Sequence, residues 1–242
     1  MLQRLLPPGP ELDPDAPGAR SELLAAYAVE RSPHVRLNVV TSVDGRAVGE
    51  DGTSESLTTR TDRMLLGVIR QACDAVLVGA ATVRTEGLGR PRRTPLVVLS
   101  ASGDLTGHGF TAHAGAPGER GAPVLVVTTP RGTSTVARTL SGVDHEVIVV
   151  ESDDAQCDPV SVIEALRQRG MNRIVVEGGP SLAASLLNAG LIDEICLTVV
   201  PRIVGSGIPI FDGVRTTAMT PLQLLVEDDG VQYGRWSLRE EP

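Results

Sequence analysis

The stretch VVEGGPSLAASLLNAG, residues 175–190, joins an apolar run to a run with helical character. Glu177, Gly178, Gly179 and Pro180 lie between the two runs. Glycine lets a backbone approach a ligand closely, and proline at the first position of a helix costs no hydrogen bond. The free N–H groups at a helix start also favour an anion. The stretch therefore predicts a strand-to-helix turn, which is either an ordinary connection or a binding site for a phosphate group.

Apolar runs and helical runs alternate along the rest of the chain. The predicted strands are HVRLNVVTS (34–42), DAVLVG (74–79), PLVVLS (95–100), PVLVVTT (123–129), HEVIVVE (145–151), RIVVEGG (173–179) and DEICLTVVP (193–201). Helices are expected over 59–73, 133–140, 159–169 and 180–189 from the spacing of their apolar residues. This alternation indicates a sheet that is covered by helices on both faces.

The C-terminal part of the chain has a different pattern. PLQLLVEDDGVQYGRWSL, residues 221–238, predicts two strands around an Asp-Asp-Gly turn. The expected fold class is therefore α/β, with a mixed, mostly parallel central sheet, helices on both faces and an antiparallel C-terminal hairpin. The glycine-rich stretch 101–122 is predicted to be a long loop, and loops of that length are usually functional or mobile.

The composition excludes several classes of function. A formal net charge of −8 argues against a general binder of nucleic acids or membrane surfaces. All 22 basic residues are arginine, so no lysine Schiff base can form. The three cysteines are isolated, and we see no signal peptide and no apolar run long enough to span a membrane. We expect a reduced protein of the cytoplasm.

Common catalytic motifs are missing as well. The four histidines, His34, His108, His113 and His145, lack the spacing of metal ligands, so no metal is expected. GGPSLAAS does not match a nucleophile elbow, and the first strand is not followed by GxGxxG. A second strand-to-helix junction, AVLVGAATVR (75–84), offers small residues and one hydroxyl, which suit either close helix packing or another close approach to a ligand.

Three blocks together carry a resemblance. They are NVVTSVDGRAVGEDGTSESLTTRTDR (38–63), LLGVIRQACDAVLVGAATVRTEG (65–87) and RIVVEGGPSLAASLLNAGLIDEICLTVVPRIVGSG (173–207). Their order and spacing resemble the pyrimidine reductase domain family of riboflavin biosynthesis, which has a dihydrofolate-reductase-like fold. The resemblance implies a reductase domain over 34–242, outside which lies an N-terminal arm, 1–33. Within the arm, the proline- and acid-rich residues 1–18 predict a surface segment, and 21–30 predict a short helix with Ser21 as its cap.

The resemblance also implies an activity. The family reduces a ribosylamino-pyrimidine 5′-phosphate to its ribitylamino form, with a hydride passing from NADPH to the sugar C1. The deaminase signature that often precedes this domain is not found, so a stand-alone reductase is expected, as a homodimer with a small-molecule substrate. A pterin or dihydrofolate-type NADPH reductase and a non-catalytic NADPH-binding protein remain as alternatives, because one fold serves many functions.

The family motifs assign site residues by position. Asp44 in TSVDG is the expected catalytic residue, although Asp44-Gly45 also suits a simple turn. The substrate set implied by the resemblance is Asn38, Ser42, Asp44, Ser54, Thr58, Arg63 and Glu177. The cofactor set is Gly79, Ala80, Thr82, Val83, Ser100, Gly178, Gly179, Pro180 and Ser181, in which Ser100, helped by an arginine, is a candidate for the adenosine 2′-phosphate.

The chain also departs from the family pattern. Ser56 replaces a frequent tryptophan, and Arg46 replaces a lysine. RTEGLGRPRR (84–93) replaces a D-D-P-x-L-x-x-R segment that helps to hold the substrate phosphate in the family. Arg63 and Arg70 are the other candidates for that phosphate, and each also suits a solvent-facing position. The cofactor is therefore better supported than the pyrimidine phosphate.

Overall fold

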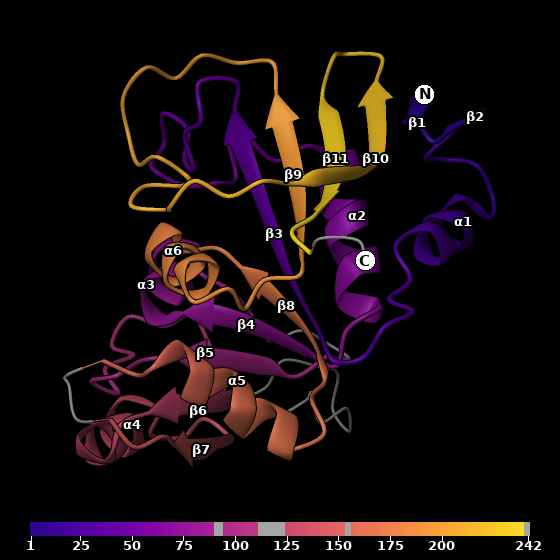
Figure 1. Ribbon diagram of the computed structural model, residues 1–242. Coiled ribbons are helices and arrows are strands. Elements are labelled where there is room, and N and C mark those ends of the chain that lie inside the picture. The colour runs from indigo at the N-terminus through magenta and orange to yellow at the C-terminus, as the bar shows by residue number, and fades with distance from the viewer. Residues whose placement is uncertain (90–93, 111–123, 153–155, 240–242) are drawn as a thin grey trace.

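The computed structural model describes residues 1–89, 94–110, 124–152 and 156–239. Within these residues a single sheet of 11 strands runs in the order β2-β1-β10-β11-β9-β3-β8-β4-β5-β6-β7 (Figure 1). Arg90, Arg92, Arg93, His113 and most of the second half of the predicted 101–122 loop lie outside the described residues. In the first half of that loop, Leu105 and Phe110 are buried against the sheet.

The central strands are parallel, as the alternation of strands and helices predicted. They are β3 (His34–Ser42), β4 (Ala75–Gly79), β5 (Leu96–Leu99), β6 (Val124–Thr128), β7 (His145–Val149), β8 (Arg173–Glu177) and β9 (Glu194–Val200). The long strand β3 lies between β8 and β9, with Leu37 opposite both Val176 and Ile195. The carboxyl ends of β3, β4, β5 and β8 therefore meet along one edge of the sheet.

The antiparallel part begins at β9. The predicted hairpin is confirmed as β10 (Thr220–Glu227) and β11 (Gln232–Ser237), and β11 pairs with β9. The reading of residues 1–18 as a surface arm missed two strands, β1 (Leu2–Leu6) and β2 (Pro8–Leu12). Strand β1 pairs with β10, and Leu2 is fully buried. A boundary at residue 33 stays a prediction.

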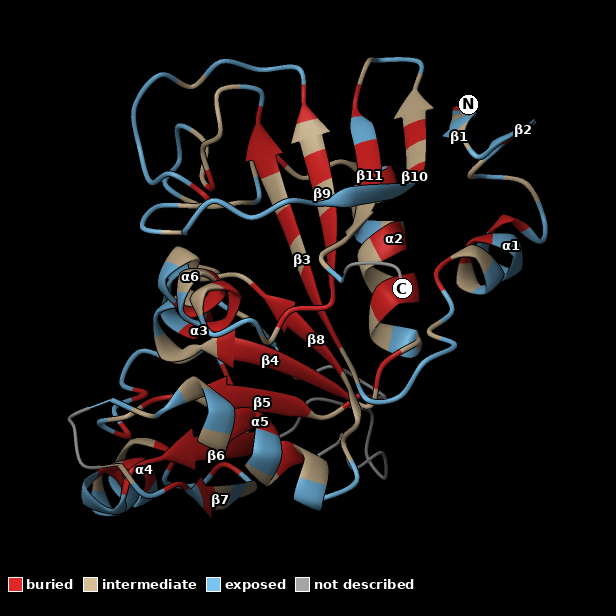
Figure 2. Ribbon diagram, viewed as in Figure 1, coloured by how far each residue is buried: buried red, intermediate tan, exposed pale blue. Residues whose placement is uncertain are grey.

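Helices cover both faces of the sheet, and the alternation of side chains along each strand explains how. Odd-numbered residues of β3 such as Val35 and Leu37 face α5 (Pro159–Gln168) and α6 (Pro180–Asn188), which lie in front of the sheet in Figure 1. The other face packs against α1 (Ala19–Ala26), α2 (Arg60–Gln71), α3 (Ala80–Thr85) and α4 (Thr133–Thr139), the last preceded by the short turn η1 (Pro130–Gly132). The strands between the two layers are almost wholly buried (Figure 2).

Most helices begin and end near the residues predicted from the sequence, but the predicted start of α1 was wrong. Helix α2 begins after Thr59, whose hydroxyl accepts the N–H of Asp62. Ser21 does not cap α1. The helix begins after Gly18, because that glycine adopts a φ of 96° and turns the chain into the helix earlier. The predicted dihydrofolate-reductase-like class, a mixed sheet with helices on both faces, is confirmed.

Candidate active site

A cleft with two lobes opens along the carboxyl ends of the parallel strands. The lobe beside α5, of about 490 Å³, lies between β5, α3, α5 and α6. The lobe beside α2, of about 430 Å³, lies between β3, α2 and α3. The two lobes share Ala81, Thr82 and Gly179 among their lining residues, so they adjoin at these residues, which we call the neck of the cleft. We call the two lobes the α5 lobe and the α2 lobe.

The glycines of the opening stretch form the neck. Gly178 and Gly179 have φ angles of 76° and 73°, a region that glycine adopts without strain. A Cβ atom on Gly178 would lie 2.9 Å from Thr82 Cγ2, and one on Gly179 would lie 3.1 Å from Thr82 Oγ1. Helix α6 starts after Gly179 with no side-chain cap. The two glycines therefore pack closely against Thr82, and the amides at the uncapped start of α6 suit the diphosphate of a dinucleotide.

The α5 lobe contains most of the predicted cofactor residues. Gly79, Ala80, Thr82, Ser100, Gly179 and Ser181 all line it. Ser100 lies just after β5 and is buried. Arg84 of α3 is exposed at the same lobe, and its guanidinium donates to the Asp104 carbonyl at 3.1 Å. This lobe therefore offers small residues near the neck and a cation farther out.

The floor of the α2 lobe carries two carboxylates. Glu177 accepts a bidentate pair from Arg70, with Nε–Oε1 at 2.7 Å and Nη2–Oε2 at 2.5 Å. Asp62 accepts the hydroxyl of Thr198 at 2.6 Å. Burial raises the pKa of Asp62 above its ordinary value, although the bond from Thr198 lowers it. Glu177 lies opposite Asn38 in the sheet, so β8, β3 and α2 together shape this floor.

The wall of the α2 lobe is formed by the loop before α2. Ser54 and Thr58 line it as predicted. Glu86 binds that loop, because its carboxylate accepts both the N–H and the hydroxyl of Ser54 at 3.1 Å. Arg63 lies at the same lobe, is about half exposed, and forms an ion pair with Glu55. Both candidate phosphate ligands are thus ion-paired, and Arg63 is the more accessible of the two.

Three predicted site residues do not line either lobe. Val83 is fully buried in the core. Ser42 donates its hydroxyl to Asp44 at 2.6 Å, and Asp44 also accepts the amides of Val204 and Gly205 at 3.1 and 2.8 Å. These bonds lower the pKa of Asp44. Asp44 in the TSVDG motif thus connects the end of β3 to the loop after β9. This structural role is close to the alternative given above, in which Asp44-Gly45 forms a simple turn.

We expect replacement of Asp44 by asparagine to loosen that loop. The loop continues to Ile208 and Ile210, which line the α2 lobe, so the bonds of Asp44 also hold a wall of that lobe, and its direct catalytic role stays a prediction. In the variant, amide hydrogen exchange at Val204 and Gly205 should become faster, because a carboxamide oxygen accepts more weakly than a carboxylate. Exchange that stays unchanged while kcat falls would instead assign Asp44 a direct catalytic role.

Two residues of the cleft were missed by sequence reasoning. Glu86 lies in the segment 84–93 that departs from the family pattern, and Asp62 lies in the predicted helix 59–73, and neither was among the predicted site residues. A signal for Asp62 exists, because Asp62, Leu66 and Arg70 recur every four residues and so share one face of α2. This face lies beside the buried face of Leu65 and Ile69 and lines the α2 lobe.

Other kinds of site find no support in the described part of the chain. Cys73, Cys157 and Cys196 are free, and burial raises the pKa of each thiol. In residues 1–89, 94–110, 124–152 and 156–239 no cluster of three metal-binding side chains occurs. Over the same residues, none of the helices has the length and apolar character that crossing a bilayer requires.

A mixed sheet with a two-lobed cleft at its strand ends defines the class predicted above, a dihydrofolate-reductase-like α/β protein. A crystal structure of a pyrimidine reductase-like protein from Corynebacterium diphtheriae superimposes with a TM-score of 0.67, at 26% identity, covering 86% of this chain and 93% of that one. The chain belongs to the RibD C-terminal domain family, whose family model matches residues 33–233.

Two curated relatives place the chain within that family. The 2,5-diamino-6-ribosylamino-4(3H)-pyrimidinone 5′-phosphate reductase of Methanothermobacter thermautotrophicus is 31% identical over 193 residues, which cover 72% of this chain and 80% of that protein. The riboflavin biosynthesis protein RibD of Mycobacterium tuberculosis is 30% identical over 188 residues, covering 78% of this chain and 48% of that protein. The chain thus spans about half the length of the RibD relatives.

Proposed function

We propose that this protein is an NADPH-dependent reductase that converts a ribosylamino-pyrimidine 5′-phosphate to its ribitylamino form. The observation that carries the proposal is the two-lobed cleft whose neck is formed by Gly178 and Gly179. One lobe has the small, amide-rich lining that a dinucleotide needs, and the other has polar groups for a heterocycle. Membership of the RibD C-terminal domain family and similarity to a pyrimidinone 5′-phosphate reductase support the proposed reaction.

The cofactor is assigned to the α5 lobe. The amides at the start of α6, after Gly179, would bind the diphosphate, and Gly79, Ala80 and Thr82 would line the nicotinamide side. Ser100 and the exposed Arg84 would hold the 2′-phosphate that distinguishes NADPH from NADH. When bound there, NADPH supplies a hydride to the substrate.

The substrate is assigned to the α2 lobe. Asn38, Ser54 and Thr58 offer hydrogen bonds to a pyrimidine or a ribose, and Arg63 offers a cation to the 5′-phosphate. The Arg70–Glu177 pair fixes the floor, because a bidentate bond leaves both side chains in one geometry. Holding the substrate against the neck supplies most of the rate, since two positioned reactants avoid the entropy of an encounter.

The test is turnover by the purified protein. We expect NADPH oxidation when the ribosylamino-pyrimidine 5′-phosphate is added and none without it. The product should carry a ribityl chain, which mass spectrometry detects as a gain of two hydrogens. NADPH binding without oxidation of NADPH by any such substrate would instead favour a non-catalytic nucleotide-binding protein.

Arg84 provides a test of the preference for NADPH. Replacing Arg84 by glutamine removes the charge near Ser100, and we expect the dissociation constant for NADPH to rise by about tenfold, a typical value for a charge-assisted bond to phosphate. The constant for NADH should change little, because NADH lacks the 2′-phosphate. Calorimetric titration of both nucleotides measures the ratio. An equal loss for the two nucleotides would remove Arg84 from the 2′-phosphate site.

We also propose that the protein forms a homodimer in the cytoplasm, as the family resemblance implied. Val43, Ile203 and Ile208 are exposed apolar side chains of neighbouring loops, and the amide of Val43 donates to the Arg202 carbonyl at 2.9 Å. Such a patch favours contact with another protein surface. Sedimentation equilibrium measures the mass in solution, and a monomer at all concentrations would contradict the dimer.

A further inference from the structure

The two carboxylates on the floor of the α2 lobe, Glu177 and Asp62, differ in whether a basic side chain neutralises their charge. Glu177 is neutralised by the bidentate bond from Arg70. Asp62 is partly buried, and in the described part of the chain no basic side chain forms an ion pair with it, although the charge of Arg63 acts on it from beyond ion-pair distance. The neighbouring Arg63 forms its ion pair with Glu55. A buried carboxylate that lacks a cation is costly unless donors reach it.

Thr198 supplies one such donor and fixes the direction of Asp62. The hydroxyl on β9 donates to Oδ1 of Asp62 at 2.6 Å, across the face of the sheet that α2 covers. Thr198 lies opposite Val40 in the sheet, and both Val40 and Asp62 line the α2 lobe. One carboxylate oxygen is therefore held by the protein, and the other oxygen remains available to a ligand in the lobe.

We propose that Asp62, oriented by Thr198, binds the 2-amino-4(3H)-oxopyrimidine edge of the substrate. This edge presents a ring N–H and an exocyclic NH₂ side by side, which match the two oxygens of one carboxylate. The inference deepens the proposed function, on which it rests, because it names the form of pyrimidine that the α2 lobe accepts.

The same geometry disfavours a deaminated pyrimidine. When the 2-amino group is replaced by a 2-oxo group, a carbonyl oxygen faces the carboxylate oxygen and one hydrogen bond is lost. A site that is built to bind N–H donors rejects the analogue without them, since its buried acceptor is left unpaired. Asp62 thus selects a substrate that still carries its 2-amino group.

Two kinds of molecule share this edge. The first is a 2,5-diamino-6-ribosylamino-4(3H)-pyrimidinone 5′-phosphate, the substrate named for a relative of this chain. The second is a reduced pterin such as dihydrofolate. Arg63 at the exposed side of the lobe suits the phosphate of the first, and a conjugated carboxylate of the second would also find a cation there.

The test compares three substrates on the wild-type protein with NADPH: the 2-amino pyrimidine phosphate, its 2-oxo counterpart and dihydrofolate. We expect kcat/KM for the better 2-amino compound to exceed that for the 2-oxo compound by about tenfold to a hundredfold. Comparing kcat/KM for the 2-amino pyrimidine phosphate with that for dihydrofolate shows which of these two molecules is the substrate. Equal or better turnover of the 2-oxo compound overturns the proposal and leaves the proposed reductase function intact.

The variant Asp62→Asn then tests the residue. A carboxamide offers one donor and one acceptor, which match the 2-oxo edge. The preference for the 2-amino compound over the 2-oxo compound should therefore be lost or reversed, mainly through a change in KM. Glu227→Gln is the matched control, because Glu227 also accepts a threonine hydroxyl, that of Thr61 at 2.7 Å, but lies outside both lobes. A preference that survives in Asp62→Asn excludes Asp62.

The outcomes also separate this inference from the proposed function. If none of the three compounds is reduced, the reductase function fails. Calorimetric binding of the same compounds in the presence of NADP⁺ then still compares the 2-amino and 2-oxo edges. If thermal melting shows that Asp62→Asn does not fold, the ratio of kcat/KM for the 2-amino and 2-oxo compounds on the wild-type protein decides the proposal. Thr198→Val then provides a second variant, in which the orientation of Asp62 is lost.

Discussion

Replacing Gly179 by valine should raise the dissociation constant for NADPH by about a hundredfold, which corresponds to roughly 3 kcal/mol. Gly179 has a φ of 73°, and a Cβ atom there would lie 3.1 Å from Thr82 Oγ1 in the neck of the cleft. Valine adds two further methyl groups where the diphosphate is proposed to pass. The change in nicotinamide fluorescence on titration with NADPH measures the constant.

The control for this variant is Gly170→Val. Gly170 has a φ of 81° and no heavy atom within 4 Å of an added Cβ, so it carries the same backbone strain far from the cleft. Both variants should lose some stability, because a β-branched residue adopts this conformation poorly. Only Gly179→Val should lose affinity for NADPH. An affinity that is unchanged in Gly179→Val would remove the glycine neck from the cofactor site.

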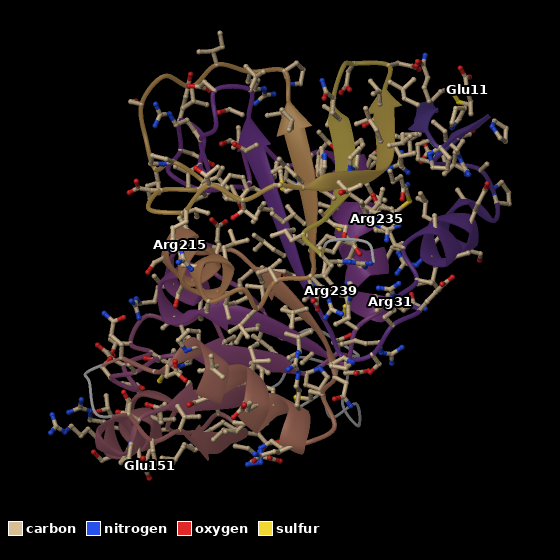
Figure 3. The ribbon with its side chains drawn as sticks, in the orientation of Figure 1. Glu11, Arg31, Glu151, Arg215, Arg235 and Arg239 are labelled. Atoms are coloured by element: carbon tan, nitrogen blue, oxygen red, sulfur yellow. The ribbon has the colours of Figure 1, made fainter. Side chains whose placement is uncertain are left out.

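Replacing Glu194 by glutamine should lower the free energy of unfolding at pH 7 by about 3 kcal/mol, the scale for breaking a buried ion pair. Glu194 is buried at the start of β9 and accepts from Arg36 at 3.0 Å and from Arg235 at 2.7 Å. Arg36 is fully buried, and Arg235 extends from β11 (Figure 3). Without the carboxylate, two buried guanidinium groups lose their counter-charge. Urea unfolding measures the difference.

The pH dependence of this difference has a defined sign. Burial raises the pKa of Glu194, but the bonds from His34 and Arg235 and the charges of Arg36 and Arg235 outweigh it and hold the pKa well below its usual range. A lowered folded-state pKa stabilises the protein above the unfolded-state value of about 4.3, and this stability is lost as the pH falls. The difference in the free energy of unfolding between wild type and Glu194→Gln should therefore be largest at pH 7 and decrease below about pH 4.

The exposed carboxylate Glu11, labelled in Figure 3, provides the control for this second prediction. Glu11→Gln should leave the free energy of unfolding nearly unchanged at both pH values, since surface charges contribute little. A gap between wild type and Glu194→Gln that persists undiminished at low pH would show that the loss arises from packing rather than from charge.

Much of the fold could be predicted because its signals are local. The apolar run of β3 and the period of α2 are each written within a dozen residues. The strand β1 was missed for the opposite reason. Its proline-rich surroundings read as a surface segment, and it becomes a strand only because β10, more than two hundred residues later, offers its edge.

The candidate site divides in the same way. Gly178, Gly179 and Pro180 were found because a strand-to-helix turn with free amides is a local feature. Asp44 matched a local motif too, and its catalytic role stays a prediction, whereas its bonds to Val204 and Gly205 in a distant loop could be seen only in the structure. Asp62 was missed because its significance depends on Thr198, which is 136 residues away.

The sequence by itself determined the parallel core, the helices on both of its faces and the glycine turn, since hydrophobic period and backbone freedom act over neighbouring residues. Only the tertiary structure decided which charged groups are buried and paired. Arg36 with Glu194, and Asp62 with Thr198, acquire their environments from strand register and helix packing across the sheet. Desolvation is a property of the folded whole, so no local pattern in the sequence states it.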